Sequence, residues 1–150
     1  MKPLIVLIST FLISVIITKI VYGSVDFSLS GRISMSVMLL FTAMAHFVFT
    51  KGMTMMLPNF IPFKSEIIYL TGIIEIFAAI GLFLTNLKLV TAWLLIVFFI
   101  VILPANIYAA LQNIDYQKGT SDGNGLTYLW FRIPLQILFI SWTYFFAIQN

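Results

Sequence analysis

The sequence predicts an all-α membrane protein, a bundle of about five transmembrane helices. Of its 150 residues, 61% are hydrophobic and only 9% are charged, whereas soluble domains carry roughly 25% charged residues. The mean hydropathy is +1.09. The apolar runs are continuous rather than alternating, which favours membrane-spanning helices over the strands of a barrel. We expect residues 1–150 to form a single integral membrane domain.

The amino-acid composition also excludes several kinds of chemistry for this protein. The chain has no cysteine and one histidine, which excludes disulfides, thiol redox chemistry and cysteine-ligated metals. A histidine-rich metal or haem site is disfavoured for the same reason. The net charge of +3 comes from residues that flank apolar runs, so it indicates no nucleic-acid partner.

The amino-terminal segment 1–22 allows two interpretations. Lys2 precedes an apolar run that extends to Val21, which could be a signal peptide cleaved near Gly23. The alternative is a permanent first helix, with Lys19 extending its amine to the membrane interface. We favour the permanent helix.

Four further helices are expected, each near the ~20 residues needed to span a bilayer. They cover about residues 32–50, 65–84, 89–111 and 126–148. Arg32 and Lys88 begin two of them and are interpreted as interfacial anchors. The 51–64 connection is apolar and is expected to lie in the interface or to fold back over the bundle, whereas the polar 112–125 connection is a flexible loop by composition. Basic residues weakly predict a cytoplasmic amino terminus.

The strongly polar residues of helices two to five share one half of the membrane. These residues are His46, Glu75, Asn106, Arg132 and Gln136. Counting from the helix ends at 1.5 Å per residue places them roughly 6–9 Å and 15 Å below the side that carries the 51–64 and 112–125 connections. Charged groups inside a span are costly and usually functional.

We therefore predict a buried polar pocket formed by helices two to five, open to that side. Glu75 and Arg132 are opposite in charge and are expected to form an ion pair, with Asn106 and Gln136 as hydrogen-bonding partners. His46 adds a group that exchanges protons near neutral pH. The alternative interpretation is that the ion pair only fixes the register of the helices.

Several motifs, taken in order, resemble the DoxX-like family of small bacterial membrane proteins. The resemblance spans about residues 32–146. The motifs are Ala45-His46-Phe47, Met56-Leu-Pro58-Asn-Phe-Ile-Pro62, Leu70-Thr-Gly72-Ile-Ile-Glu75, Leu103-Pro-Ala-Asn106 and Leu129-Trp-Phe-Arg132-Ile-Pro-Leu-Gln136.

The resemblance implies a four-helix core over residues 32–148, with residues 1–22 as an added helix, in the inner membrane of a bacterial cell. Relatives of the broad group are linked to quinone-coupled sulfur oxidation, to oxidative-stress complexes and to the chaperoning or export of other proteins. Thiol-based roles do not fit this chain because it lacks cysteine.

Three functions remain open. The first is binding of a quinone- or lipid-like small molecule in the polar pocket, as part of a membrane redox or stress system. The second is a non-enzymatic helper or scaffold subunit, which binds a membrane protein partner or a second copy of itself. The third is a proton-linked transporter that uses Glu75 and His46 as relay groups. Few spans and no inverted repeat make transport the weakest of the three.

Overall fold

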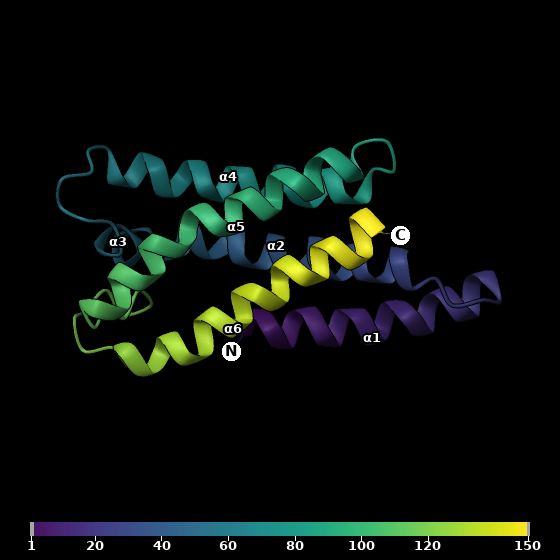
Figure 1. Cartoon of the computed structure of the whole chain (residues 1–150), viewed down its shortest axis with the longest axis horizontal. Helices are drawn as coiled ribbons and strands as arrows, with labels where there is room; N and C mark the ends of the chain where they lie inside the picture. The colour runs from purple at the N-terminus through teal and green to yellow at the C-terminus, as the bar shows by residue number, and fades with distance from the viewer. Residues whose placement is uncertain (1, 150) are drawn as a thin grey trace.

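The computed structural model describes residues 2–149, and this part of the chain is helical with no strand (Figure 1). The elements are α1 (Lys2–Tyr22), α2 (Phe27–Val48), α3 (Thr50–Met55), α4 (Lys64–Phe83), α5 (Lys88–Leu111), α6 (Leu126–Thr143) and the π-helix η1 (Tyr144–Gln149). Five of these segments are long and apolar enough to cross a membrane. The predicted class, an all-α multi-pass membrane bundle, is confirmed.

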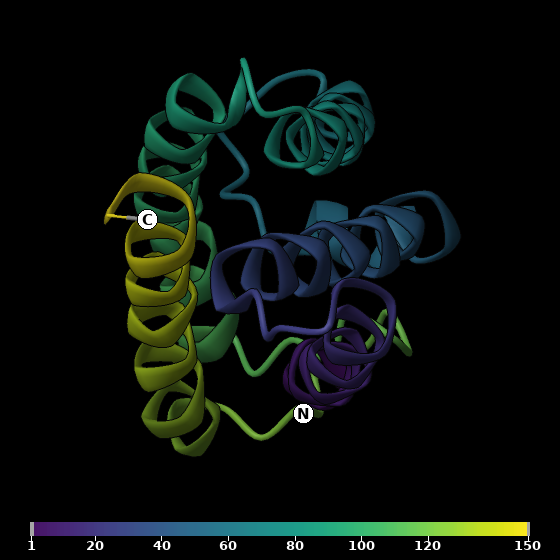
Figure 2. The same ribbon diagram turned by 90° about the vertical axis from the view of Figure 1, so that its right-hand side faces the viewer.

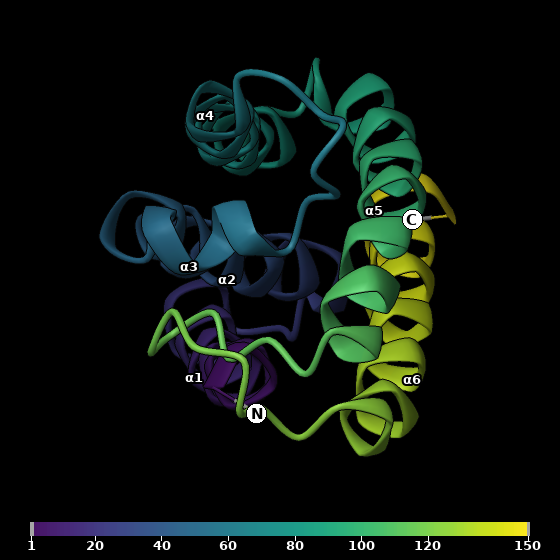
Figure 3. The same ribbon diagram turned by 90° about the vertical axis from the view of Figure 1, so that its left-hand side faces the viewer.

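The helices form two layers around α2. One layer contains α4, α2 and α1 side by side, and α5 and α6 cross its face as the second layer (Figures 2 and 3). Helix α2 packs against α1, α4, α6 and η1, whereas α5 packs mainly against α4, α6 and η1. The α2 helix is therefore the central element.

The start of α2 and the connection after it differ from the sequence expectation. Helix α2 begins at Phe27 rather than near Arg32, because the side chain of Asp26 accepts the backbone N–H of Leu29 at 2.8 Å and caps the helix start. The connection after α2 contains the short helix α3 (Thr50–Met55).

Helix α4 approaches α2 closely. Ser36 Oγ donates to the carbonyl oxygen of Ala79 at 2.9 Å, and a Cβ at Gly72 would lie 3.0 Å from the Cβ of His46. Small residues at such crossings let helix backbones approach, and packing together with interhelical hydrogen bonds then replaces the hydrophobic driving force that is missing in lipid. The α2–α4 contact thus fixes the position of His46 relative to α4.

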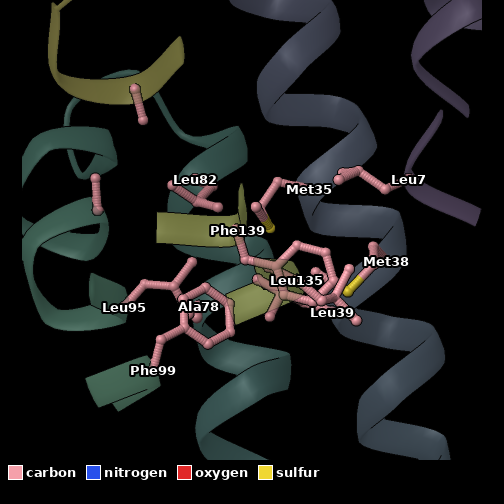
Figure 4. Packing of buried hydrophobic residues seen from close by; sticks show 13 residues of the cluster. Leu7, Met35, Met38, Leu39, Ala78, Leu82, Leu95, Phe99, Leu135 and Phe139 are labelled. Carbon is pink, nitrogen blue, oxygen red and sulfur yellow. The ribbon is translucent and has the colours of Figure 1, made fainter. Parts of the chain in front are cut away.

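The apolar core lies between the two layers. Figure 4 shows Met35 and Leu39 of α2, Leu82 of α4, Phe99 of α5 and Phe139 of α6 gathered there. The rings of Phe99 and Phe139 are 5.8 Å apart. Large apolar side chains also cover the outside of the bundle, as expected where lipid rather than water is the surrounding solvent.

The first helix packs against the rest of the bundle. Leu7, Ser14 and Thr18 form its buried stripe, and Phe11 contacts Trp142 of α6 and Phe146 of η1 at ring distances of 5.0 and 5.5 Å. Helix α1 is shifted along the bundle, so that its carboxyl-terminal end projects beyond the α4–α5 turn (Figure 1).

Candidate functional site

The five predicted site residues do not form one pocket. His46 Nε2 lies 3.6 Å from Glu75 Oε1. The side-chain amide of Gln136 donates to the carbonyl oxygen of Phe99 at 2.5 Å, and the amide of Asn106 donates to the carbonyl of Ile102 on its own helix at 3.0 Å. The structure therefore brings together His46 and Glu75, and it uses Gln136 to join α6 to α5.

The predicted ion pair between Glu75 and Arg132 is wrong. Within residues 2–149 Glu75 pairs with His46, and Arg132 has no ion pair. The depth estimate assumed that all helices end in one plane, but α4 begins beside α3, beyond the end of α2 (Figure 1). This offset places Glu75 level with His46.

The His46–Glu75 pair sits at the α2–α4 crossing. Thr71, one helical turn before Glu75, lies 3.0 Å from His46 Nδ1 through its hydroxyl oxygen. The Glu75 side chain is 6% exposed and that of His46 16%. The second carboxylate oxygen, Glu75 Oε2, is buried without a hydrogen-bond partner in the described chain. A carboxyl group so placed is costly to ionise unless a positive charge faces it.

Arg132 instead lines a cavity of about 240 Å³ near the amino-terminal end of α1. The cavity is bounded by Lys2, Pro3, Tyr116, Gln117, Tyr128, Arg132 and Leu135. Tyr128, Arg132 and Leu135 are spaced i, i+4, i+7, so they share one face of α6. Two cations, two phenols and one amide thus converge on a space whose lining includes no carboxylate.

The guanidinium group of Arg132 has an unused hydrogen-bond donor. Its Nε is buried and has no hydrogen-bond partner among the residues described. A buried guanidinium nitrogen without a partner loses hydration with nothing in return. Because Arg132 also lines the cavity, its guanidinium group suits a ligand that carries carboxylate, phosphate or carbonyl oxygens.

The 112–125 loop forms one wall of this cavity and is held by its own turns. Asp115 accepts the backbone N–H groups of Gln117 and Lys118, and the ring of Tyr116 packs edge-on against Phe49 at 6.2 Å. A hydrogen bond from Thr120 holds the pKa of Asp122 below its ordinary value. The loop is polar as expected, but these contacts and the close approach of Tyr116 to α3 position it.

Most of the cavity lining was missed by sequence reasoning. The i, i+4 spacing of Tyr128 and Arg132 places these two side chains on one face of a helix, and from this spacing they could have been predicted to line the same site. Lys2 is far from α6 in sequence and Tyr116 lies in the loop before it, and no local pattern places either beside Arg132. Their arrangement depends on the shift of α1 and on the path of the loop.

A second arginine was also misinterpreted. Arg32, expected to anchor α2 at the interface, is buried at 8% exposure and donates to the carbonyl oxygen of Leu82 at 3.3 Å. Leu82 belongs to the last turn of α4, whose carbonyl groups lack intrahelical partners. Arg32 therefore caps α4 and is a structural residue of the α2–α4 contact.

The fold and these contacts define a multi-pass helical membrane protein with one buried histidine–carboxyl pair and one cation-lined cavity. The chain belongs to the family described as Domain of unknown function (DUF8561), whose model matches residues 35–147. The matched region holds α4, α5 and α6 with most of α2, and α1 precedes it. No curated protein and no solved structure matches the chain.

Proposed function

We propose that this protein binds the head group of a quinone- or lipid-like amphiphile in the cavity beside Arg132. The observation that carries the proposal is the unpartnered, buried Nε of Arg132 in a cavity that also presents Lys2 and two tyrosines. These groups are donors at neutral pH, so they favour a head group rich in acceptor oxygens.

The size of the cavity supports a head group rather than a whole ligand. Its volume of about 240 Å³ lies below the roughly 300–1,000 Å³ of sites that enclose a drug-sized molecule. Exposed apolar residues follow on the same two helices, Ile5 on α1 and Ile133 on α6. The tail of the ligand would therefore lie along the lipid-facing surface, outside the cavity.

A setting in a membrane redox or stress system of the bacterial inner membrane is part of the same proposal. It is supported by the resemblance to the DoxX-like family, whose motifs include Leu129-Trp-Phe-Arg132. The Arg132 of that motif lines the cavity. A quinone carbonyl and a lipid phosphate both offer the acceptor oxygens that this arginine lacks.

The helper or scaffold alternative has its own support. Gln136 and Arg32 each donate to the carbonyl oxygen of another helix, and Asn106 donates to a carbonyl oxygen of its own helix. Polar side chains that join helices in this way are expected of a purely structural polar layer. The cavity is the feature that a structural role leaves unexplained.

The test uses the full chain in detergent, with thermal unfolding as the readout. The probes are dioctanoylphosphatidylglycerol, dioctanoylphosphatidylcholine, decylubiquinone and inorganic phosphate. A ligand that binds only the folded protein raises the unfolding temperature. We expect a rise with the anionic lipid or with the quinone, loss of that rise in Arg132→Gln, and no change in Lys51→Gln.

Lys51 is a suitable control because it is exposed on α3, at the same end of the bundle, and lies outside the cavity lining. A rise with the anionic lipid alone would identify a lipid head group, and a rise with decylubiquinone alone would identify a quinone. A rise with phosphate as large as with the lipid would mean that the tail adds nothing. If no probe stabilises the protein, or if Arg132→Gln responds like the parent, binding at this cavity is refuted and the helper interpretation stands.

A further inference from the structure

The contacts of His46 determine where its protons lie. The Thr71 hydroxyl is 3.0 Å from His46 Nδ1 and also 2.8 Å from the carbonyl oxygen of Ile68. A hydroxyl has one proton to donate. If Thr71 donates it to Ile68, then Nδ1 must carry a proton and donate to Thr71. If Thr71 donates it to His46, then Nδ1 is bare and Nε2 carries the proton.

The second arrangement leaves Glu75 poorly satisfied. With a neutral ring protonated at Nε2, Glu75 would be either an ionised carboxylate facing one neutral donor at 3.6 Å or an acid whose own proton, on Oε2, has no acceptor in the described chain. Oε2 has no hydrogen-bond partner of either kind within residues 2–149. An isolated ionised carboxylate in an apolar medium is far more costly than a neutral acid.

No other cation balances Glu75. Of the eight lysine and arginine side chains, none forms an ion pair with Glu75 in the described chain. On the elements packed against α2 and α4, Lys51 of α3 is exposed and Arg132 of α6 lines the separate cavity. Tyr69 of α4 stacks on Phe47, beside the pair, and a phenol side chain has no cationic form. Only a proton is left to balance the carboxyl group.

We infer that His46 and Glu75 together hold one exchangeable proton, in addition to the proton that Thr71 fixes on Nδ1. In one form the extra proton is on Nε2, so that an imidazolium faces a carboxylate. In the other it is on Oε1, so that a neutral imidazole faces a carboxylic acid. Transfer of the proton between Nε2 and Oε1 leaves the total charge of the pair unchanged.

The exposed fractions of the two side chains indicate which of them a proton reaches first. The His46 side chain is 16% exposed and the Glu75 side chain 6%, so a proton reaches the pair through the imidazole. His46 lies near the α3 end of α2, two residues before the helix ends at Val48. The α2–α4 contact is thus a buried site for one proton near the α3 end of the bundle, and it is separate from the cavity at Arg132.

The chain offers a clean measurement because His46 is its only histidine. In protein labelled with ¹⁵N-histidine, one pair of ring signals reports the state of each nitrogen. We expect Nδ1 to carry a proton and to donate it to Thr71. At neutral pH we expect either a protonated Nε2 or an infrared band of a protonated carboxylic acid that disappears in Glu75→Gln. A bare Nδ1, or a protonated Nδ1 with neither of these signals, would refute the inference.

Variants separate the role of Thr71 from a general effect on folding. Thr71→Val removes the acceptor of the Nδ1 proton, so the neutral ring should change to the form protonated at Nε2, and Thr71→Ser should restore the parent spectrum. Thr42→Val is the matched control, because the Thr42 hydroxyl bonds only to the carbonyl of Leu39. Where the parent ring is neutral, an unchanged ring spectrum in Thr71→Val would overturn the assignment, and the parent spectrum decides the question even if a variant fails to fold.

Discussion

The side-chain amide of Gln136 on α6 donates to the carbonyl oxygen of Phe99 on α5 at 2.5 Å, in a part of the bundle where Gln136 is only 2% exposed. The two helices meet again through the rings of Phe99 and Phe139. This hydrogen bond between helices has no water to compete with it. It therefore contributes to the association of α5 with α6.

Replacing Gln136 should weaken that association. Gln136→Leu keeps the approximate volume and removes the donor, so we expect the free energy of unfolding to fall by about 1–2 kcal/mol, the upper range for such bonds in membranes. Unfolding by dodecyl sulfate in mixed micelles measures the change. Gln149→Leu, at an exposed position near the end of η1, is the control and should leave stability unchanged. Equal stability of both variants would contradict this account.

Arg32 should be needed for the end of α4. Arg32→Met removes the donor to the Leu82 carbonyl and leaves a buried acceptor unsatisfied, which costs about 1–3 kcal/mol. We expect a lower unfolding temperature than for Lys19→Met, in which an exposed lysine of α1 is replaced. If the two variants unfold together, Arg32 acts as the interfacial anchor that its position in the sequence suggests.

Gly52 should be required for the cavity wall. A Cβ at this position would overlap the backbone carbonyl of Tyr116, so Gly52→Ala should displace the 112–125 loop from α3. We expect weaker stabilisation by the ligand of the Arg132 cavity and faster proteolysis within the loop. Thr54→Ala is the control on the same helix, since the Thr54 hydroxyl bonds only to the carbonyl of Lys51. Normal proteolysis of Gly52→Ala would show that the loop is not held by this contact.

Trp142 joins the end of α6 to the start of α2. Its Nε1 donates to the carbonyl oxygen of Gly31 at 3.0 Å, and its ring packs against Phe146 at 4.8 Å. Trp142→Phe keeps much of the ring contact and loses the hydrogen bond, so stability should fall by about 0.5–1.5 kcal/mol. Trp93→Phe, on the exposed face of α5, should have a smaller effect. A larger loss for Trp93 would argue against this role of Trp142.

The turn at Asp122 should respond to acid. The hydrogen bond from Thr120 lowers the pKa of Asp122, so the carboxylate form stabilises the turn above the ordinary pKa of aspartate, and this contribution is lost as pH falls through the lowered value. Thr120→Val should bring the pKa back toward the ordinary value. A ¹³C-aspartate titration of the parent and the variant measures both values, and identical titrations would exclude the hydrogen bond.

The apolar runs and the polar residues within them were readable in the sequence. Continuous apolar segments of spanning length have few physical alternatives, because every backbone group in lipid must be bonded within the segment. The five helices and the unusual status of Glu75 and Arg132 followed from that constraint. The cap at Asp26 is a local feature of the sequence, but an aspartate before an apolar run does not by itself determine where the helix starts.

Tertiary structure alone decided which polar residues meet. Helix ends do not share one plane. The offset of α4 against α2 therefore places Glu75 beside His46 and not beside Arg132. The shift of α1 along the bundle and the path of the 112–125 loop brought Lys2 and Tyr116 to Arg132. Such offsets depend on close contacts such as Gly72 against His46 and Gly52 against Tyr116, which the periodicity of a single helix does not encode.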